Sequence, residues 1–122
     1  MDIPSFEERK VDGGKNNVVF YKLVIGFQKN NKKWFLLKRY SEFDTLDKFL
    51  KDIFPSMPSL PGKTIFKLSD SKQIENRRVV LTQYMKTLIN RRDMRTCPTF
   101  RKFIELENNF PYSQTYQPHK VA

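Results

Sequence analysis

Cysteine, histidine and glycine are scarce in this 122-residue sequence, which has one cysteine, one histidine and four glycines. The single cysteine, Cys97, can neither close a disulfide within the chain nor build a structural zinc site, which favours a reducing, cytoplasmic setting. The longest apolar stretch, residues 18–27, is interrupted by Lys22 and is far shorter than the roughly 20 residues of a membrane-spanning helix. Residues 1–4 lack the basic and apolar regions of a signal peptide. We therefore expect one soluble globular domain.

The residues that enzymes use are also missing or isolated. His119 lies in the polar C-terminal end, and no histidine lies near Cys97 to act as its base. Asp44, Asp47 and Asp52 share one expected helix, but no second helix offers a histidine to complete a metal site. We expect these aspartates on the exposed face of their helix. The sequence has no glycine-rich phosphate loop either, so we expect no catalytic residue, no metal and no cofactor.

Positive charge, in contrast, is abundant, since 23 Lys and Arg residues against 13 Asp and Glu residues give a formal net charge of +10. A field of this sign attracts polyanions such as nucleic acid, anionic lipid surfaces or acidic proteins. Residues 29–39 contain several cations and no acid, which fits either a solvated turn or contact with a flat anionic surface. Nucleic acid is not an expected partner, because the aromatic residues interleave with apolar core positions on the strands and form no exposed row.

Hydrophobic alternation in the first third predicts β-strands at residues 3–11, 18–27 and 34–40. Turn-forming residues separate these strands, at 12–17 and at 30–33. Because consecutive strands joined by short turns pair in opposite directions, we expect a three-stranded antiparallel β-meander. The expected inward face of the second strand consists of Val19, Tyr21, Leu23, Ile25 and Phe27.

Helical patterns follow the strands. The first helix is expected to begin with Ser41 as N-cap, with Asp44 three residues on as the capping-box acid, and to end before Pro55. A long helix is expected from about residue 70 to Asn90. Its apolar stripe consists of Ile74, Leu81, Tyr84, Met85 and Leu88.

A last helix opens at Pro98, where proline suits the first helical position. The expected fold class is thus α+β, a three-stranded antiparallel β-meander packed against a helical subdomain of three to four helices with a Pro-rich crossover. Residues 1–110 form the expected domain. Residues 111–122 are polar and contain proline, as is typical of a C-terminal tail.

A candidate phosphate site lies where the third strand passes into the first helix, at Arg39-Tyr40-Ser41. A helix N-terminus presents unpaired N–H groups and a partial positive charge, so it favours a phosphate group. Arg39 can add a planar, two-pronged donor for phosphate oxygens, and Tyr40 offers an apolar ring face that suits a sugar-like ring. The alternative from these residues alone is that Arg39 pairs with an acid and Tyr40 packs in the core.

Arg77 precedes Leu81 by four residues and Tyr84 by seven, on the apolar stripe of the long helix. Because burying an unpaired charge is costly, this placement indicates a polar pocket at the edge of the core. The alternative is a buried ion pair with an aspartate, Asp44, Asp47 or Asp70. Arg78 points elsewhere and is expected in solvent.

The segment after Pro55 carries two further candidate features. Prolines at 55, 58 and 61 follow the polyproline II repeat, so this strap can either hold Lys63 in place or bind an SH3-type partner. Ile65 and Phe66 lie beside cations in a loop, which fits either core packing or insertion into a membrane. Each inserted side chain would contribute roughly 1.5–3 kcal/mol to membrane binding.

Three motifs in order resemble the phox-homology (PX) domain. They are Arg39-Tyr40-Ser41-Glu42-Phe43, then Pro58-Ser59-Leu60-Pro61-Gly62-Lys63, then Arg77 ahead of Leu81 and Tyr84. The resemblance extends from about Ile3 to Leu106. It implies a phosphoinositide-binding module of sorting-nexin type, which docks on endosomal or related membranes as a cytoplasmic, peripheral protein.

The resemblance also implies a role for each site residue. Arg39 would hold the 3-phosphate of phosphatidylinositol 3-phosphate, Tyr40 would stack under the inositol ring, and Lys63 would meet the 1-phosphate. Arg77 would hydrogen-bond the 4- and 5-hydroxyls and so disfavour lipids phosphorylated there. Ile65 and Phe66 fall where the family's membrane-inserting loop lies. A single Pro61 stands where many members carry a Pro-Pro pair.

Overall fold

The computed structural model describes residues 1–14, 16–27, 32–60 and 71–109. Strands β1 (Asp2–Val11), β2 (Asn16–Phe27) and β3 (Lys32–Arg39) form one antiparallel sheet in the order β1-β2-β3. The expected meander is therefore confirmed. Between β1 and β2, the short 3-10 turn η1 (Asp12–Gly14) uses left-handed backbone at Gly13 and Gly14, with φ of 69° and 92°, which glycine adopts without strain.

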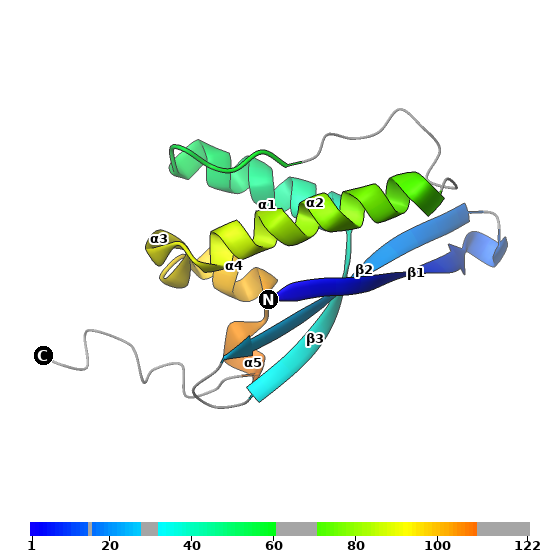
Figure 1. The fold of residues 1–122 in the computed structure, drawn as a ribbon, viewed down its shortest axis with the longest axis horizontal. Helices are drawn as coiled ribbons and strands as arrows, with labels where there is room; N and C mark the ends of the chain where they lie inside the picture. Colours follow the sequence, from blue (N-terminus) through cyan, green and yellow to red (C-terminus); the bar gives the residue numbers. More distant parts are fainter. Residues whose placement is uncertain (15, 28–31, 61–70, 110–122) are drawn as a thin grey trace, which may run out of the picture.

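Helices cover one side of this sheet. They are α1 (Tyr40–Ile53), α2 (Ser71–Ile89), α3 (Arg92–Arg95), α4 (Pro98–Phe103) and α5 (Leu106–Asn109). Figure 1 shows α1 and α2 lying together over the sheet, with α2 running along β1 and the three short helices gathered at one end. The described part of the chain thus has five helices where three or four were expected, because the four-residue α3 and α5 are too short to show a helical period.

The core fills the space between the sheet and the helices. The expected inward face of β2 is buried, except that the Phe27 side chain lies outside the described set, and the expected stripe of α2 is also buried. Near the short helices, the Trp34 indole N–H of β3 donates to the backbone oxygen of Ile104 at 2.9 Å. This hydrogen bond joins the sheet to the C-terminal helices. The expected α+β class is confirmed.

The first turn of α1 differs from the sequence expectation. The helix begins at Tyr40, Arg39 is its N-cap, and the backbone N–H of Arg39 donates to Glu42 Oε2 at 2.8 Å. The prediction of Ser41 as N-cap with Asp44 as partner is therefore wrong, because the acid that reaches back to the helix start is Glu42. Along α1, Phe43, Leu46 and Leu50 are buried, whereas Phe49 and Ile53 are 42% and 54% exposed.

Candidate functional site

The junction of β3 and α1 places two of the predicted site residues. Arg39 is the last residue of β3 and has an exposed side chain, and Tyr40 opens α1 with its ring partly buried against the core. Strand register pairs Arg39 with Phe20 and Lys38 with Tyr21, so β2 supports this junction from the side. An arginine at the N-terminus of a 14-residue helix adds a full charge to the partial positive charge of the helix end.

Arg77 of α2 reaches the same junction. Its side chain lies on the buried side of the helix with 7% of the residue exposed, and its Cζ lies 3.9 Å from the centre of the Tyr40 ring. Stacking on an aromatic face fixes the position of a guanidinium and also the plane in which its N–H groups point. Arg77 therefore contacts Tyr40 directly, and Arg39 is the residue that immediately precedes Tyr40 in the chain.

Burial and charge act together on Tyr40. Burial raises the pKa of Tyr40, and the Arg77 guanidinium opposes this rise. The hydroxyl therefore stays protonated at neutral pH, and the residue offers a neutral ring with one face on Arg77. A neutral aromatic ring beside a fixed cation can carry the apolar face of a polyol whose hydroxyls or phosphates the cation binds.

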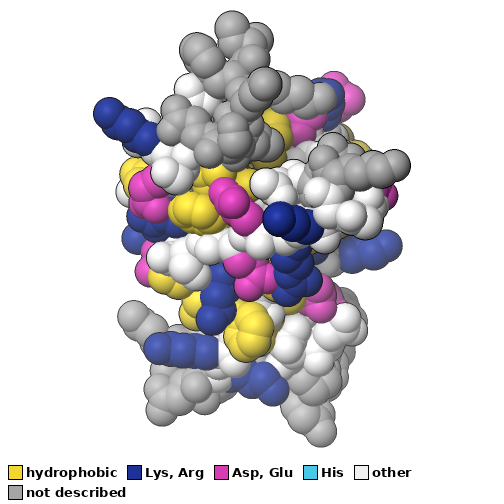
Figure 2. Space-filling model, turned by 90° about the vertical axis from the view of Figure 1, so that its right-hand side faces the viewer, with side chains coloured by type: hydrophobic (Ala, Val, Ile, Leu, Met, Phe, Trp, Pro, Cys, Tyr) yellow, Lys and Arg dark blue, Asp and Glu magenta, His cyan; other side chains and the backbone are white. Residues whose placement is uncertain are grey.

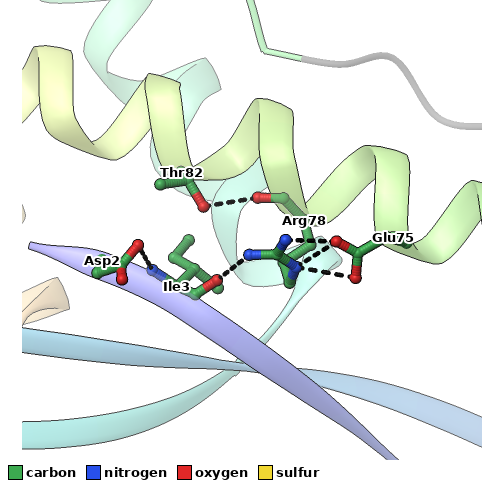
Figure 3. A network of polar contacts seen from close by, with 5 residues as sticks. All are labelled: Asp2, Ile3, Glu75, Arg78 and Thr82. Carbon is green, nitrogen blue, oxygen red and sulfur yellow. Dashed lines mark hydrogen bonds and ion pairs between the residues drawn. The ribbon is translucent and has the colours of Figure 1, made fainter.

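A polar clamp fixes α2 against β1 one residue beyond Arg77. Arg78 Nε donates to both carboxylate oxygens of Glu75 at 2.8–2.9 Å, and Arg78 Nη1 donates to the backbone oxygen of Ile3 (Figure 3). The expectation that Arg78 is solvated is wrong, since only 21% of its side chain is exposed. This guanidinium lowers the pKa of Glu75, mainly through the hydrogen bond. The clamp sets where α2 lies on the sheet and hence where Arg77 points.

A second polar pair joins α1 to α2 inside the core. Asp47 is 4% exposed and accepts a hydrogen bond from the Tyr84 hydroxyl at 2.6 Å, while Lys51 Nζ lies 2.9 Å from its other oxygen. The prediction that Asp47 lies on an exposed helix face is therefore wrong. Burial raises the pKa of Tyr84, and Asp47 raises it further. These contacts give Asp47 a structural role between the two helices that carry Tyr40 and Arg77.

A groove in the described part of the molecule lies elsewhere, between α1 and the C-terminal helices. It encloses about 520 Å³ and is lined on the α1 side by Leu46 and Phe49 and on the other side by Phe103. Its charged rim carries both signs, Lys38 and Lys102 with Glu42 and Glu105, so it is not built for an anion. None of Arg39, Tyr40 and Arg77 lines it.

The remaining predicted site residues, Lys63, Ile65 and Phe66, lie outside the described residues, as does the predicted tail. In the parts that are described, no three His, Cys, Asp or Glu side chains cluster as metal ligands, and no helix combines the length and apolar character that crossing a bilayer requires. On the face where α2 begins, Lys and Arg side chains alternate with acidic ones around hydrophobic side chains (Figure 2). On this face, neighbouring acidic side chains therefore partly offset the positive charge.

Sequence reasoning gave no role beyond the core to one residue next to this site, Tyr21 of β2. Its ring packs edge-on against Phe43, with centroids 6.4 Å apart, and Phe43 follows Tyr40 by three residues on α1. The hydroxyl is buried at this junction. The available signal was a hydroxyl-bearing residue on a strand face otherwise built of Val, Leu and Ile side chains.

Comparison with known proteins agrees with this architecture. The chain is 30% identical over 110 residues to the serine/threonine-protein kinase Sgk3 of Rattus norvegicus, a match that covers 88% of this chain and 21% of the kinase. It is 28% identical over 90 residues to sorting nexin-16 of Mus musculus, covering 72% of this chain and 26% of the nexin. The chain thus spans about a quarter or less of these relatives.

A solved structure and a family model identify the domain. The X-ray structure of a designed CISK-PX domain superposes with a TM-score of 0.77 at 28% identity, covering 84% of this chain and 95% of that one. The model of the PX domain matches residues 27–107, well over half of the 122 residues. The chain therefore belongs to the PX domain family, whose members are phosphoinositide-binding modules and not catalysts.

Proposed function

We propose that this chain binds phosphatidylinositol 3-phosphate and so recruits the protein that carries it to endosomal-type membranes, as a cytoplasmic, peripheral domain. The observation that carries the proposal is the stack of the Arg77 guanidinium on the Tyr40 ring, directly beside Arg39 at the start of α1. A planar donor, a ring face and a helix N-terminus meet at one junction. These are the features that a phosphorylated cyclic polyol requires.

Each residue has a distinct role in this proposal. Arg39, exposed at the helix N-cap, binds the 3-phosphate with two parallel N–H donors. The Tyr40 ring supports the inositol ring. Arg77, held against the Tyr40 ring, hydrogen-bonds the 4- and 5-hydroxyls, and a phosphate at either position would be too bulky for this contact.

Membrane docking adds several weak contributions to headgroup binding. The net charge of +10 favours an anionic leaflet, where each nearby Lys or Arg contributes about 1 kcal/mol. In the proposal, Lys63 meets the 1-phosphate, and Ile65 and Phe66 insert beside it. Because each term is small, the domain binds reversibly and needs the headgroup for selectivity.

The alternative function, an SH3-type interaction through the strap from Pro55 to Pro61, has less support. Ser56 has φ of 61°, in the left-handed region, whereas polyproline II needs φ near −75°. Arg91 Nη1 donates to the Ser56 backbone oxygen at 2.9 Å and holds this bend. Met57 and Leu60 pack against the core, so the domain itself covers the part of the strap surface that these residues provide.

Vesicles that differ only in the phosphate position of the inositol ring test the proposed function. With net charge and salt held constant, we expect binding to phosphatidylinositol 3-phosphate and at least tenfold weaker binding to the 4-phosphate and 5-phosphate isomers, measured by co-sedimentation. The reason is that Arg39 and Arg77 recognise different positions of one ring. Equal binding to all three isomers would show that charge alone attracts the domain, and binding of an SH3 domain without lipid binding would establish the alternative.

A further inference from the structure

The Tyr21 hydroxyl is a buried polar group of the core that lacks the usual well-aligned hydrogen bond. Tyr21 is 1% exposed, and its hydroxyl has no hydrogen-bond partner of good geometry in the described structure. Buried tyrosine hydroxyls almost always have a partner, since leaving one unpaired is costly. By contrast Tyr84, equally buried, donates to Asp47 at 2.6 Å. An unpaired hydroxyl at this depth therefore calls for a functional explanation.

Four neighbours of Tyr21 place this hydroxyl beside the proposed headgroup site. The Tyr21 ring lies edge-on against Phe43 and tilted against Phe6, each with centroids 6.4 Å apart, so its direction is fixed by packing. Tyr21 pairs across the sheet with Lys38, two residues before Tyr40. Arg77, which stacks on Tyr40, is the cation that acts most strongly on Tyr21.

Electrostatics agree with this placement. Burial raises the pKa of Tyr21 to about 12, and the nearby Arg77 guanidinium opposes the rise through its charge and through a weak hydrogen-bonding contact with the hydroxyl. The hydroxyl consequently remains neutral at physiological pH, with an oxygen that can accept a hydrogen bond from a cation. The guanidinium is close enough to act on this oxygen although no well-formed hydrogen bond joins them here. A small adjustment of Arg77 would supply one.

We propose that Tyr21 is a positioning residue of the headgroup site, whose hydroxyl oxygen accepts an N–H of Arg77 when the inositol ring binds. The Tyr40 ring then fixes the plane of the guanidinium and Tyr21 fixes its rotation within that plane. The remaining N–H groups of Arg77 point at the 4- and 5-hydroxyls of the ring. This inference rests on the proposed function, and it assigns a source of headgroup selectivity to a residue that touches no lipid.

The substitution Tyr21→Phe removes the oxygen and keeps the ring. Because the hydroxyl has only a poorly aligned contact with Arg77 in the fold, the melting temperature should change little. Affinity for vesicles containing phosphatidylinositol 3-phosphate should fall about tenfold, the usual effect of losing one hydrogen bond to a charged group. The ratio of the affinities for this lipid and for phosphatidylinositol 3,5-bisphosphate should also decrease, because Arg77 is less restrained in the variant.

Tyr84→Phe is the matched control. It removes a hydroxyl that is satisfied by Asp47, so it should lower the melting temperature and leave lipid affinity and preference unchanged at a temperature where the protein is folded. The two variants thus have opposite expected effects on stability and on binding. Affinity and preference equal to wild type in Tyr21→Phe would overturn the proposal, as would a loss of stability without loss of preference. Failure of the wild-type chain to bind these vesicles would contradict the proposed function itself, and so is distinguished from a failure of the role given to Tyr21.

Discussion

Replacing Arg77 by alanine should abolish binding to vesicles containing phosphatidylinositol 3-phosphate while the domain stays folded. The guanidinium is held on the Tyr40 ring before the ligand arrives, so little ordering cost opposes its hydrogen bonds. Removing a charged partner from such a buried contact typically costs about 2–5 kcal/mol, which is roughly 30-fold or more in affinity. Surface plasmon resonance on immobilised vesicles would measure the loss.

Arg92→Ala is the matched control for Arg77→Ala. It removes the same charge from an exposed side chain on α3, away from the junction of β3 and α1. The net charge falls equally in both variants, so a purely electrostatic attraction would weaken equally. Arg77→Ala should lose about 2 kcal/mol or less in stability, the upper range of a desolvated cation–π contact, and circular dichroism should show an unchanged fold. Similar binding by the two variants would refute the assignment of Arg77.

Asp47→Ala should produce the largest loss of stability among single substitutions of polar residues at the interface of α1 and α2. It removes a hydrogen bond to a charged group, worth about 1.5–3 kcal/mol, and it leaves the buried Tyr84 hydroxyl without its partner. Lys51 is half-exposed and adds little. We expect the free energy of unfolding to fall by about 3 kcal/mol in urea titrations.

Two further variants separate the causes of that loss. Asp47→Asn keeps an oxygen acceptor for Tyr84 and should recover part of the stability. Asp52→Ala removes an exposed carboxylate from the same helix and should change the free energy of unfolding by less than about 0.5 kcal/mol. If Asp47→Ala were as mild as Asp52→Ala, the buried pair of Asp47 and Tyr84 would contribute nothing to the fold.

Helices and strands that are long enough to show several hydrophobic repeats could be predicted from the sequence. Alternation defined the three strands to within about two residues, and the stripe from Ile74 to Leu88 defined α2. The start of α1 could not be predicted from residue type, because Ser41 is a better N-cap than Arg39 in isolation. What decides it is the Glu42 carboxylate, which reaches back to the Arg39 N–H.

Long-range polar contacts were beyond sequence reasoning for a different reason. Arg78 binds the backbone oxygen of Ile3, which lies 75 residues away, and a backbone acceptor leaves no mark in the side-chain sequence. Asp47 looked like one of several helix-surface acids until Tyr84 was placed opposite it. The burial of Arg77 at the edge of the core could be predicted, because its charge lies on the apolar stripe of its helix.

Titration of the isotopically labelled domain with a soluble, short-chain phosphatidylinositol 3-phosphate tests most directly whether Arg39, Tyr40 and Arg77 form one site. We expect the backbone amide signals of Arg39 and Tyr40 and the Nε–H signal of Arg77 to shift together and to saturate with a single dissociation constant. Shifts at Arg39 that leave the Arg77 Nε–H signal unmoved, or that saturate at a different concentration, would contradict the account.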